Sequence, residues 1–348
     1  MSTPARRLAL SSVLMIAVEV CFGLYSYSTS TVLKGRTLSP LAFAWVRDVI
    51  AAAALLSAAA AVESRKAAPA FWIRKEDHTH LLLLGFLGVW GSQGCSALAL
   101  ANLDATDFAI FQPLMPLVAL LAGMATGAEP PLTRSAPSFG KVAGLAAAVG
   151  GAVFVVRSGG AGGGRSPNAA LGALFLAIQI VLGGSFPVAQ KPLLAKYPPL
   201  VVSAWGYAVG LGLLSLSTAT AATDAAAWDF GAAGAGAVVF AGLGASAFAY
   251  GAMSVANKLS GPLVLTAFFP LMPVTTAFFQ WVGDGRVPTL AQAGGAAAIA
   301  AGLGVVLVAK AVEEARARGA AGAAEPEVEL AVNGEPGDAA TAALLADA

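Results

Sequence analysis

Apolar residues fill long, almost uninterrupted stretches of the chain, and short polar stretches separate them. Each apolar stretch is about 20 residues long, which is enough to cross a hydrocarbon core of about 30 Å as an α-helix. The pattern predicts an all-α integral membrane protein with ten transmembrane helices, at approximately 8–30, 41–62, 80–102, 106–127, 140–157, 169–189, 199–221, 234–256, 262–283 and 290–312. The composition agrees, since 57% of the 348 residues are hydrophobic and only 11% are charged.

A short motif with two prolines occurs once in each half of the chain. FQPLMPL (111–117) and FFPLMPV (268–274) superimpose at an offset of 157 residues, and VAGLAAAVGGAVFVV aligns with QAGGAAAIAAGLGVV at an offset of 150. Because each half carries five helices, an odd number, the two halves enter the membrane from opposite sides as inverted repeats. The predicted organisation is a first five-helix repeat at 1–157, a flexible outer linker at 158–168, a second five-helix repeat at 169–312 and a disordered acidic cytoplasmic tail at 313–348.

The paired prolines are expected near the middle of the membrane, because each pair lies roughly 12–16 Å along its own helix. A proline inside a helix removes one amide donor and frees a carbonyl four residues earlier. In lipid, such a carbonyl must face protein or a water-filled cavity. The sequence therefore predicts helix kinks, which either serve packing or border a binding site, at Pro113, Pro116, Pro270 and Pro273.

The distribution of basic residues predicts the orientation of the chain. If the N-terminus is cytoplasmic, fourteen of the twenty basic residues lie in inner segments, five lie in outer loops and Arg47 lies inside the second helix. This asymmetry satisfies the positive-inside rule and places both termini in the cytoplasm. Glu19 interrupts the first apolar stretch and no A-x-A-like site follows it, so we expect a retained helix in place of a cleaved signal peptide.

Inverted repeats are typical of alternating-access transporters, whose substrate site lies near the midplane at the repeat interface. Four motifs also resemble those of EamA-type members of the drug/metabolite transporter superfamily: VAQKPLLAKYPPL (188–200), GPLVLTAFFPLMP (261–273), FAIFQPLMP (108–116) and GAEPP (127–131). The sequence is similar to the plant walls-are-thin and nodulin-like branch, although Gly283-Asp284 stands where the family has glycine and glutamate. The resemblance implies ten helices in two inverted repeats and transport of amino acids, auxin-like indoles or related small metabolites.

Several polar and aromatic residues are expected near the midplane. Glu19 lies about halfway along the first helix, where an ionised carboxylate costs several kcal/mol unless it is paired or hydrated. Arg47 is expected at a similar depth. Either Glu19 forms a structural ion pair with Arg47, or Arg47 extends outward to water, or Glu19 binds substrate or a proton. The glutamines either bond neighbouring helices or line a cavity, and the aromatic residues either pack or line it. The candidate cavity residues are Glu19, Trp90, Gln93, Gln112, Gln179, Tyr250, Phe268 and Phe269.

Functions of other classes have less support in the sequence. An enzyme is not expected, because His78 and His80 have no third metal ligand nearby and no G-x-S-x-G nucleophile motif is present. An intramembrane aspartyl protease would need two facing aspartates, and no motif supports such a pair. A channel or receptor is the main alternative, although no ring of charges or repeated filter is visible.

The expected partners are a small-molecule substrate and the lipid bilayer, with proton coupling as an open question. No nucleic acid, cofactor or metal is expected. The GxxxG pairs Gly140–Gly144 and Gly206–Gly210 leave a homodimer open, because such pairs also arise by chance among forty glycines. The plasma membrane is the default location, and a vacuolar or plastid membrane is the alternative.

Overall fold

The computed structural model of the protein describes residues 4–33, 38–103, 105–109, 111–158, 168–219, 223–285 and 290–333. All regular secondary structure in these ranges is helical. The first half contains α1 (Pro4–Leu33), α2 (Pro40–Glu63), η1 (Lys75–Asp77), α3 (His78–Leu84), η2 (Gly85–Gln93), α4 (Gly94–Asn102), α5 (Ala105–Ala109), η3 (Gln112–Leu114), α6 (Met115–Thr126) and α7 (Ala136–Ser158). The second half contains α8 (Ala169–Lys196), α9 (Pro199–Thr218), η5 (Ala225–Trp228), α10 (Gly231–Phe240), η6 (Ala241–Phe248), α11 (Ala249–Thr266), η7 (Phe269–Leu271), α12 (Met272–Asp284) and α13 (Leu290–Asn333).

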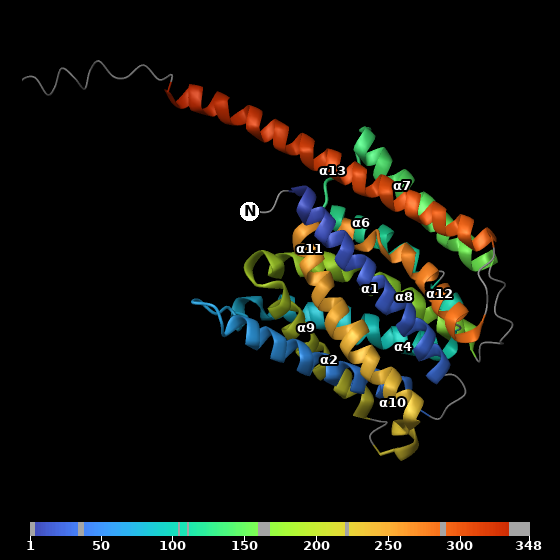
Figure 1. Cartoon of the computed structure of the whole chain (residues 1–348). Helices are drawn as coiled ribbons and strands as arrows, with labels where there is room; N and C mark the ends of the chain where they lie inside the picture. The colour runs from blue at the N-terminus through green and yellow to red at the C-terminus, as the bar shows by residue number, and fades with distance from the viewer. Residues whose placement is uncertain are drawn as a thin grey trace, which may run out of the picture.

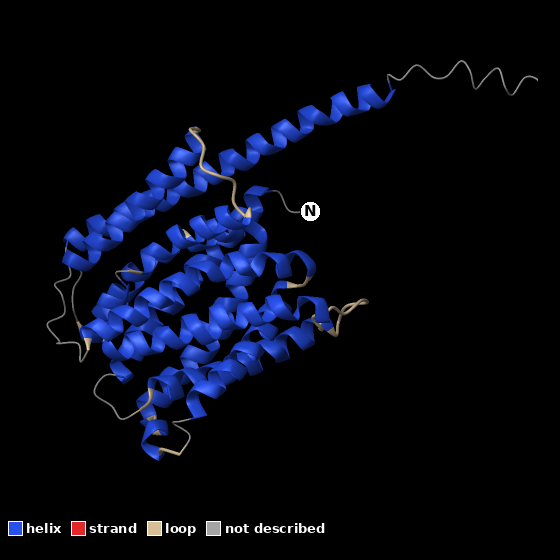
Figure 2. Ribbon diagram, turned by 180° about the vertical axis from the view of Figure 1, so that it is seen from behind, coloured by secondary structure: helices blue, strands red, loops and turns tan. Residues whose placement is uncertain are grey.

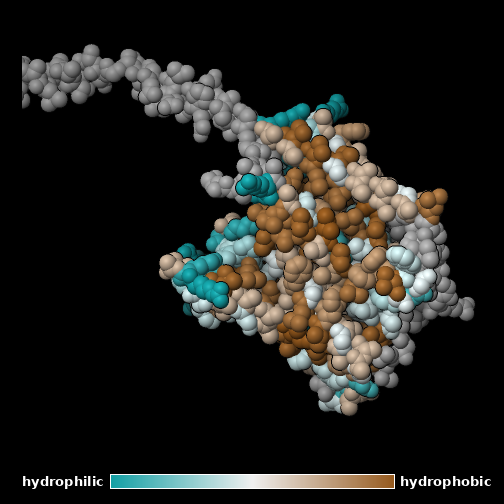
Figure 3. Space-filling model, in the orientation of Figure 1, coloured by the Kyte–Doolittle hydropathy of each residue, from teal (hydrophilic) through white to brown (hydrophobic). Residues whose placement is uncertain are grey.

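The helices are long and apolar, as a membrane protein requires. Within the described ranges, seven helical stretches are long and apolar enough to cross a bilayer, and Gln112–Thr126 is a shorter apolar helix. The all-α membrane class is therefore confirmed. Figure 3 shows apolar side chains over most of the visible face. Leu10, Val13, Ile16 and Val20 are exposed apolar residues of α1. The number of ten spans, their inverted arrangement and the cytoplasmic termini stay predictions.

The proline motifs interrupt two apolar segments completely. α5 ends at Ala109 and α6 begins at Met115, while α11 ends at Thr266 and α12 begins at Met272. A short 3₁₀ turn lies in each interval, and the four prolines lie in these turns or in the first turn of the next helix. An N–H group in the first turn of a helix has no intrahelical acceptor, so a proline at these positions removes no hydrogen bond of the helix. The expected kinks are therefore interruptions of the regular α-helix, at which a 3₁₀ turn precedes the second part of each segment.

Corresponding elements of the two halves pack in corresponding ways (Figure 1). α2 packs on α9 and α7 packs on α13. α1 packs on α11 and α12, and in the same manner α8 packs on α4 and α6. η2 and η6 are both π-helices, and η2 contacts α9 just as η6 contacts α2. Reciprocal contacts of this kind are the pattern expected for two equivalent halves that face each other.

Glycines allow several helices to approach closely. A Cβ atom on Gly302 of α13 would lie 2.5 Å from the carbonyl oxygen of Gly144 on α7, so no larger residue fits at this crossing. Gly140 faces Ala309, and Gly210 of α9 faces Val89. Figures 1 and 2 show α7 and α13 side by side at one edge of the bundle. Both GxxxG pairs thus serve contacts within the chain and lend no support to a homodimer.

The C-terminal segment differs from the sequence-based expectation. A disordered tail was expected from residue 313, but α13 continues to Asn333 and extends beyond the bundle in Figure 1. The segment 313–333 is rich in alanine and glutamate, which have high helix propensity. Most of the predicted linker, at 159–167, and the end of the predicted tail, at 334–348, lie outside the described residues.

Candidate substrate cavity

A cavity lies between the two halves of the protein. It encloses about 660 Å³ not filled by atoms, including the space at its mouth. α1, α2, η2, α4, α5, η3 and α6 line it from the first half, and α8, η6, α11, η7 and α12 line it from the second. Both halves of the chain therefore contribute to one enclosed space.

Five of the eight residues expected at a substrate site line this cavity: Gln93, Gln112, Gln179, Tyr250 and Phe269. Gln112 Nε2 donates to Gln179 Oε1 at 3.2 Å and so joins the break before α6 to α8. Gln93 lies in the π-helix η2 and accepts a hydrogen bond from Ser246 of the π-helix η6, at 3.3 Å. The glutamines were expected either to bond neighbouring helices or to line a cavity. Both descriptions apply, because these side chains bond neighbouring helices and also face the cavity. Their role in binding stays a prediction.

The other three expected residues lie outside the cavity lining. Trp90 stacks on Phe86 with ring centroids 4.9 Å apart, and its Nε1 donates to Ser217 Oγ at 2.8 Å. Phe268 is buried in the core next to the second helix break. Glu19 is fully buried in α1. Depth along a helix could be read from the sequence, but the face that each residue presents to its neighbours could not.

The expected ion pair between Glu19 and Arg47 is absent. Arg47 Nε instead donates to Asp48 Oδ1 at 2.9 Å, and Arg47 Nη1 donates to Tyr25 Oη at 2.8 Å. Neither carboxylate oxygen of Glu19 has a hydrogen-bond partner among the described residues. The prediction was wrong because it matched the two residues by depth alone, whereas the carboxylate that pairs with the guanidinium is that of Asp48, the next residue in the sequence.

Aromatic residues that the sequence did not single out complete the cavity wall. The Tyr250 ring meets Phe186 at 5.6 Å and Phe22 at 6.4 Å, both edge to face. Tyr25 holds Arg47 in place from α1. Such rings offer a rigid apolar surface with a hydroxyl at its edge. The sequence gives only the depth of an aromatic residue in the membrane, and many aromatic residues lie at the depth of the cavity. Depth alone therefore could not identify these rings as cavity residues.

The QKPLLAKYP motif is used for packing at one end of the bundle. Gln190 Oε1 accepts a hydrogen bond from Asn257 Nδ2 at 3.0 Å, which ties α8 to α11. Lys196 Nζ lies 2.6 Å from Asp77 Oδ1, and Tyr197 Oη donates to Asp77 Oδ2 at 2.8 Å. The motif thereby fixes the connection before α3 to the end of α8.

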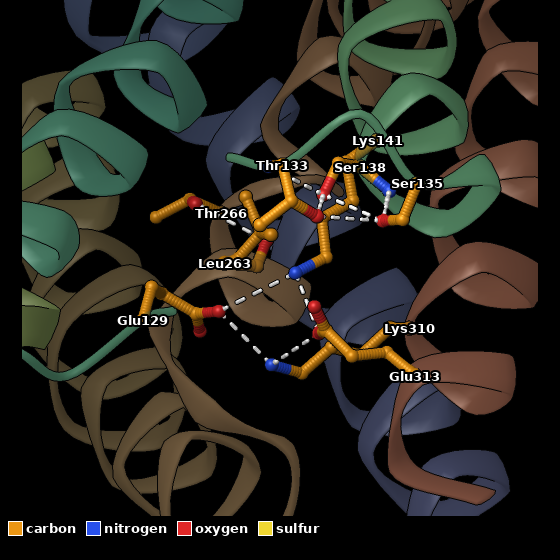
Figure 4. A network of polar contacts seen from close by, with 9 residues as sticks. All are labelled: Glu129, Thr133, Ser135, Ser138, Lys141, Leu263, Thr266, Lys310 and Glu313. Atoms are coloured by element: carbon orange, nitrogen blue, oxygen red, sulfur yellow. Dashed lines mark hydrogen bonds and ion pairs between the residues drawn. The ribbon is translucent and has the colours of Figure 1, made fainter. Parts of the chain in front are cut away.

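A ring of four alternating charges lies where α6 ends and α7 begins (Figure 4). Lys310 Nζ lies 2.9 Å from Glu129 Oε2 and 3.6 Å from Glu313 Oε2. Lys141 Nζ lies 2.5 Å from Glu313 Oε2 and 3.9 Å from Glu129 Oε2. Glu129 and Lys141 are buried, whereas Lys310 and Glu313 reach the surface. The ring connects the segment after α6 to both members of the α7–α13 pair.

The sequence matches the model of the EamA-like transporter family over residues 9–157 and 170–308. Two relatives in Arabidopsis thaliana are similar to the chain, WAT1-related protein At4g08300 and WAT1-related protein At1g44800. Each is 27% identical, and each alignment covers 57% of this chain and 59% of the relative. The chain thus spans less than two thirds of the relatives' length.

A solved crystal structure has the same fold. It aligns with a TM-score of 0.67 at 20% identity, over 88% of this chain and 98% of the other. This likeness concerns the fold alone. The two family matches together span most of the chain, and they coincide with the two halves that pack reciprocally around the cavity. The chain therefore belongs to the EamA-like transporter family.

Proposed function

We propose that the protein is a secondary transporter that moves small organic metabolites across a membrane by alternating access. In this proposal ten transmembrane helices form two inverted five-helix repeats, both termini lie in the cytoplasm, and the cavity holds the substrate. The observation that carries the proposal is that both halves line one cavity. Rocking of one half against the other would expose that cavity to each side of the membrane in turn.

The two helix breaks support this reading. Gln112 and Phe269, which lie in the 3₁₀ turns at the breaks, line the cavity from opposite halves. An interrupted α-helix at membrane depth is tolerated where the interruption is buried in protein or lines a cavity. Interrupted helices at the repeat interface are also where transporters of several folds bind their substrates.

The cavity favours a ring-bearing molecule that is neutral, zwitterionic or a monoanion. Phe22, Phe186 and Tyr250 supply aromatic surface, the three glutamines supply hydrogen bonds, and Arg47 supplies a positive charge. Amino acids and auxin-like indoles combine these features and are the candidate substrates. The plasma membrane is the proposed location, with vacuolar and plastid membranes as alternatives. A channel is the competing function, and an enzyme has no supporting motif.

Uptake into liposomes tests the proposal. We expect the purified protein to take up at least one compound from a labelled panel of amino acids, indoles and nucleobases in a saturable manner, with or without a pH gradient. Gly183→Leu should block this uptake, because a Cβ atom on Gly183 already lies 2.8 Å from Met115 and from Ser92 at the cavity wall. Gly212→Leu is the matched control, since a Cβ atom on that glycine meets nothing within 4 Å.

Two results would contradict the proposal. The first is an absence of saturable uptake across the whole panel. The second is uptake that Gly183→Leu and Gly212→Leu affect equally, because the cavity would then not be the route. Chemical turnover of a panel compound in detergent, without compartments, would favour an enzyme.

A further inference from the structure

One wall of the cavity carries a buried ion pair between neighbours in the sequence. Arg47 Nε and Nη2 donate to the two oxygens of Asp48 at 2.9 and 3.3 Å, and Nη1 donates to Tyr25 at 2.8 Å. A guanidinium has five N–H groups. Two N–H groups of Arg47 therefore have no acceptor among the described residues. Arg47 lines the cavity, while Asp48 is fully buried and does not.

Among the described residues of the elements that pack on α2, no second acid is recorded next to the pair. Tyr25 on α1, Tyr207 on α9 and Tyr250 on α11 interact electrostatically with Arg47 or Asp48. α4 brings the half-buried thiol Cys95, and α10, η5 and η6 bring no titratable side chain to α2. Among the described residues that line the cavity, Arg47 alone is charged at neutral pH. Asp48 is thus the group that balances the charge of this wall.

We infer that Asp48 is the proton-coupling residue of the transporter and that it shares Arg47 with the carboxylate of the substrate. The inference rests on the proposed function. In the empty cavity, ionised Asp48 neutralises Arg47. When a monoanion enters, its carboxylate accepts the free N–H groups of Arg47, and one proton from solution binds an Asp48 oxygen to form a neutral carboxylic acid. The site is then neutral both empty and loaded.

Electrostatics require this exchange. A monoanion that entered without a proton would leave a net negative charge buried in the membrane, which is strongly unfavourable. A zwitterion brings its own positive charge, so Asp48 stays ionised and no proton is needed. The same cavity should therefore couple a proton to monoanions and not to zwitterions. Glu19, the candidate suggested by the sequence, neither lines the cavity nor touches a basic group.

Proton uptake on binding tests the inference without any variant. The full-length protein is kept in detergent in weakly buffered solution, and labelled indole-3-acetate or tryptophan is added. Both probes carry an indole ring, but tryptophan also carries an ammonium group. We expect about one proton to be taken up per bound indole-3-acetate and about none per bound tryptophan. At pH values where Asp48 is ionised in the empty protein, the affinity for indole-3-acetate should fall about tenfold for each unit of rising pH.

Three variants identify the group that takes the proton. Asp48→Asn, which resembles the protonated acid, should bind indole-3-acetate without proton uptake and with an affinity independent of pH. Asp48→Glu should restore proton uptake, and it also carries the test if Asp48→Asn does not fold. Glu63→Gln is the matched control on the same helix, because Glu63 is a buried acid paired with Lys66. It should leave the proton count unchanged.

Several outcomes would overturn the inference: binding of indole-3-acetate without proton uptake, an unchanged proton count in Asp48→Asn, loss of proton uptake in Glu19→Gln, or no binding of either probe. The proposed function fails separately. Coupled binding in detergent without uptake into liposomes would contradict the carrier and leave the role of Asp48 intact.

Discussion

Glu129→Gln should lower the free energy of unfolding by about 2–4 kcal/mol, measured by denaturant titration in mixed micelles. Glu129 is buried, and its Oε2 atom is the only acceptor near Lys310 besides Glu313 within the described residues. Removing its charge leaves two lysines around one carboxylate. Breaking a buried ion pair typically costs about 3–5 kcal/mol. The expected loss is somewhat smaller, because Lys310 and Glu313 have access to water that screens their charges.

Two further variants separate the ring from a general loss of buried charge. Glu129→Gln combined with Lys310→Met removes one charge of each sign and leaves the Lys141–Glu313 pair, so most of the lost stability should return. Glu63→Gln should cost only about 1 kcal/mol, because its partner Lys66 is largely exposed. Equal losses in Glu129→Gln and Glu63→Gln would show that the ring does not act as a unit.

Arg47→Met should have the largest combined effect on stability and binding. It leaves Asp48 buried without its basic partner, which should cost about 3–5 kcal/mol of unfolding free energy. It also removes the charged donors proposed for the substrate carboxylate. Hydrogen bonds to charged groups contribute about 1.5–3 kcal/mol each, so two of them correspond to a loss of affinity for indole-3-acetate of at least about 100-fold.

The double variant Arg47→Met, Asp48→Asn distinguishes the two effects. With both charges removed, most of the stability should return, while the affinity for indole-3-acetate should stay low. Equilibrium binding of the labelled probe and denaturant titration measure these quantities on the same preparation. Recovery of affinity in the double variant would mean that Arg47 supports the fold and does not bind the carboxylate.

Much of the fold could be predicted because a bilayer imposes simple rules. Each predicted apolar segment falls on helical stretches of the structure, since length and hydropathy decide which residues can lie in lipid. The repeated proline motif located the two 3₁₀ turns, η3 and η7, that interrupt apolar segments. The π-helices η2 and η6 had no sequence signal, because a change in helical pitch depends on packing against α9 and α2. The continuation of α13 to Asn333 was missed because low apolar content was taken to mean disorder.

The site could be predicted only in part, because depth and direction are separate properties of a residue. Gln112 and Gln179 were expected, on depth alone, either to bond neighbouring helices or to line a cavity, and their hydrogen bond to each other was not predicted. Asp48 was not expected to pair with Arg47, because consecutive helical side chains point about 100° apart and long side chains must bend to meet. The burial of Lys141 within the ring of charges had no signal in the sequence.

Counterflow tests the central claim, transport by alternating access, most directly. Liposomes that contain the protein are loaded with a high concentration of an unlabelled substrate and diluted into a trace of the same compound in labelled form. A carrier that exposes one cavity to each side in turn should accumulate the label transiently above its equilibrium level, because unlabelled substrate keeps returning the cavity to the outside. A label that only rises to equilibrium, at a rate unaffected by the internal substrate, would contradict alternating access and indicate a channel.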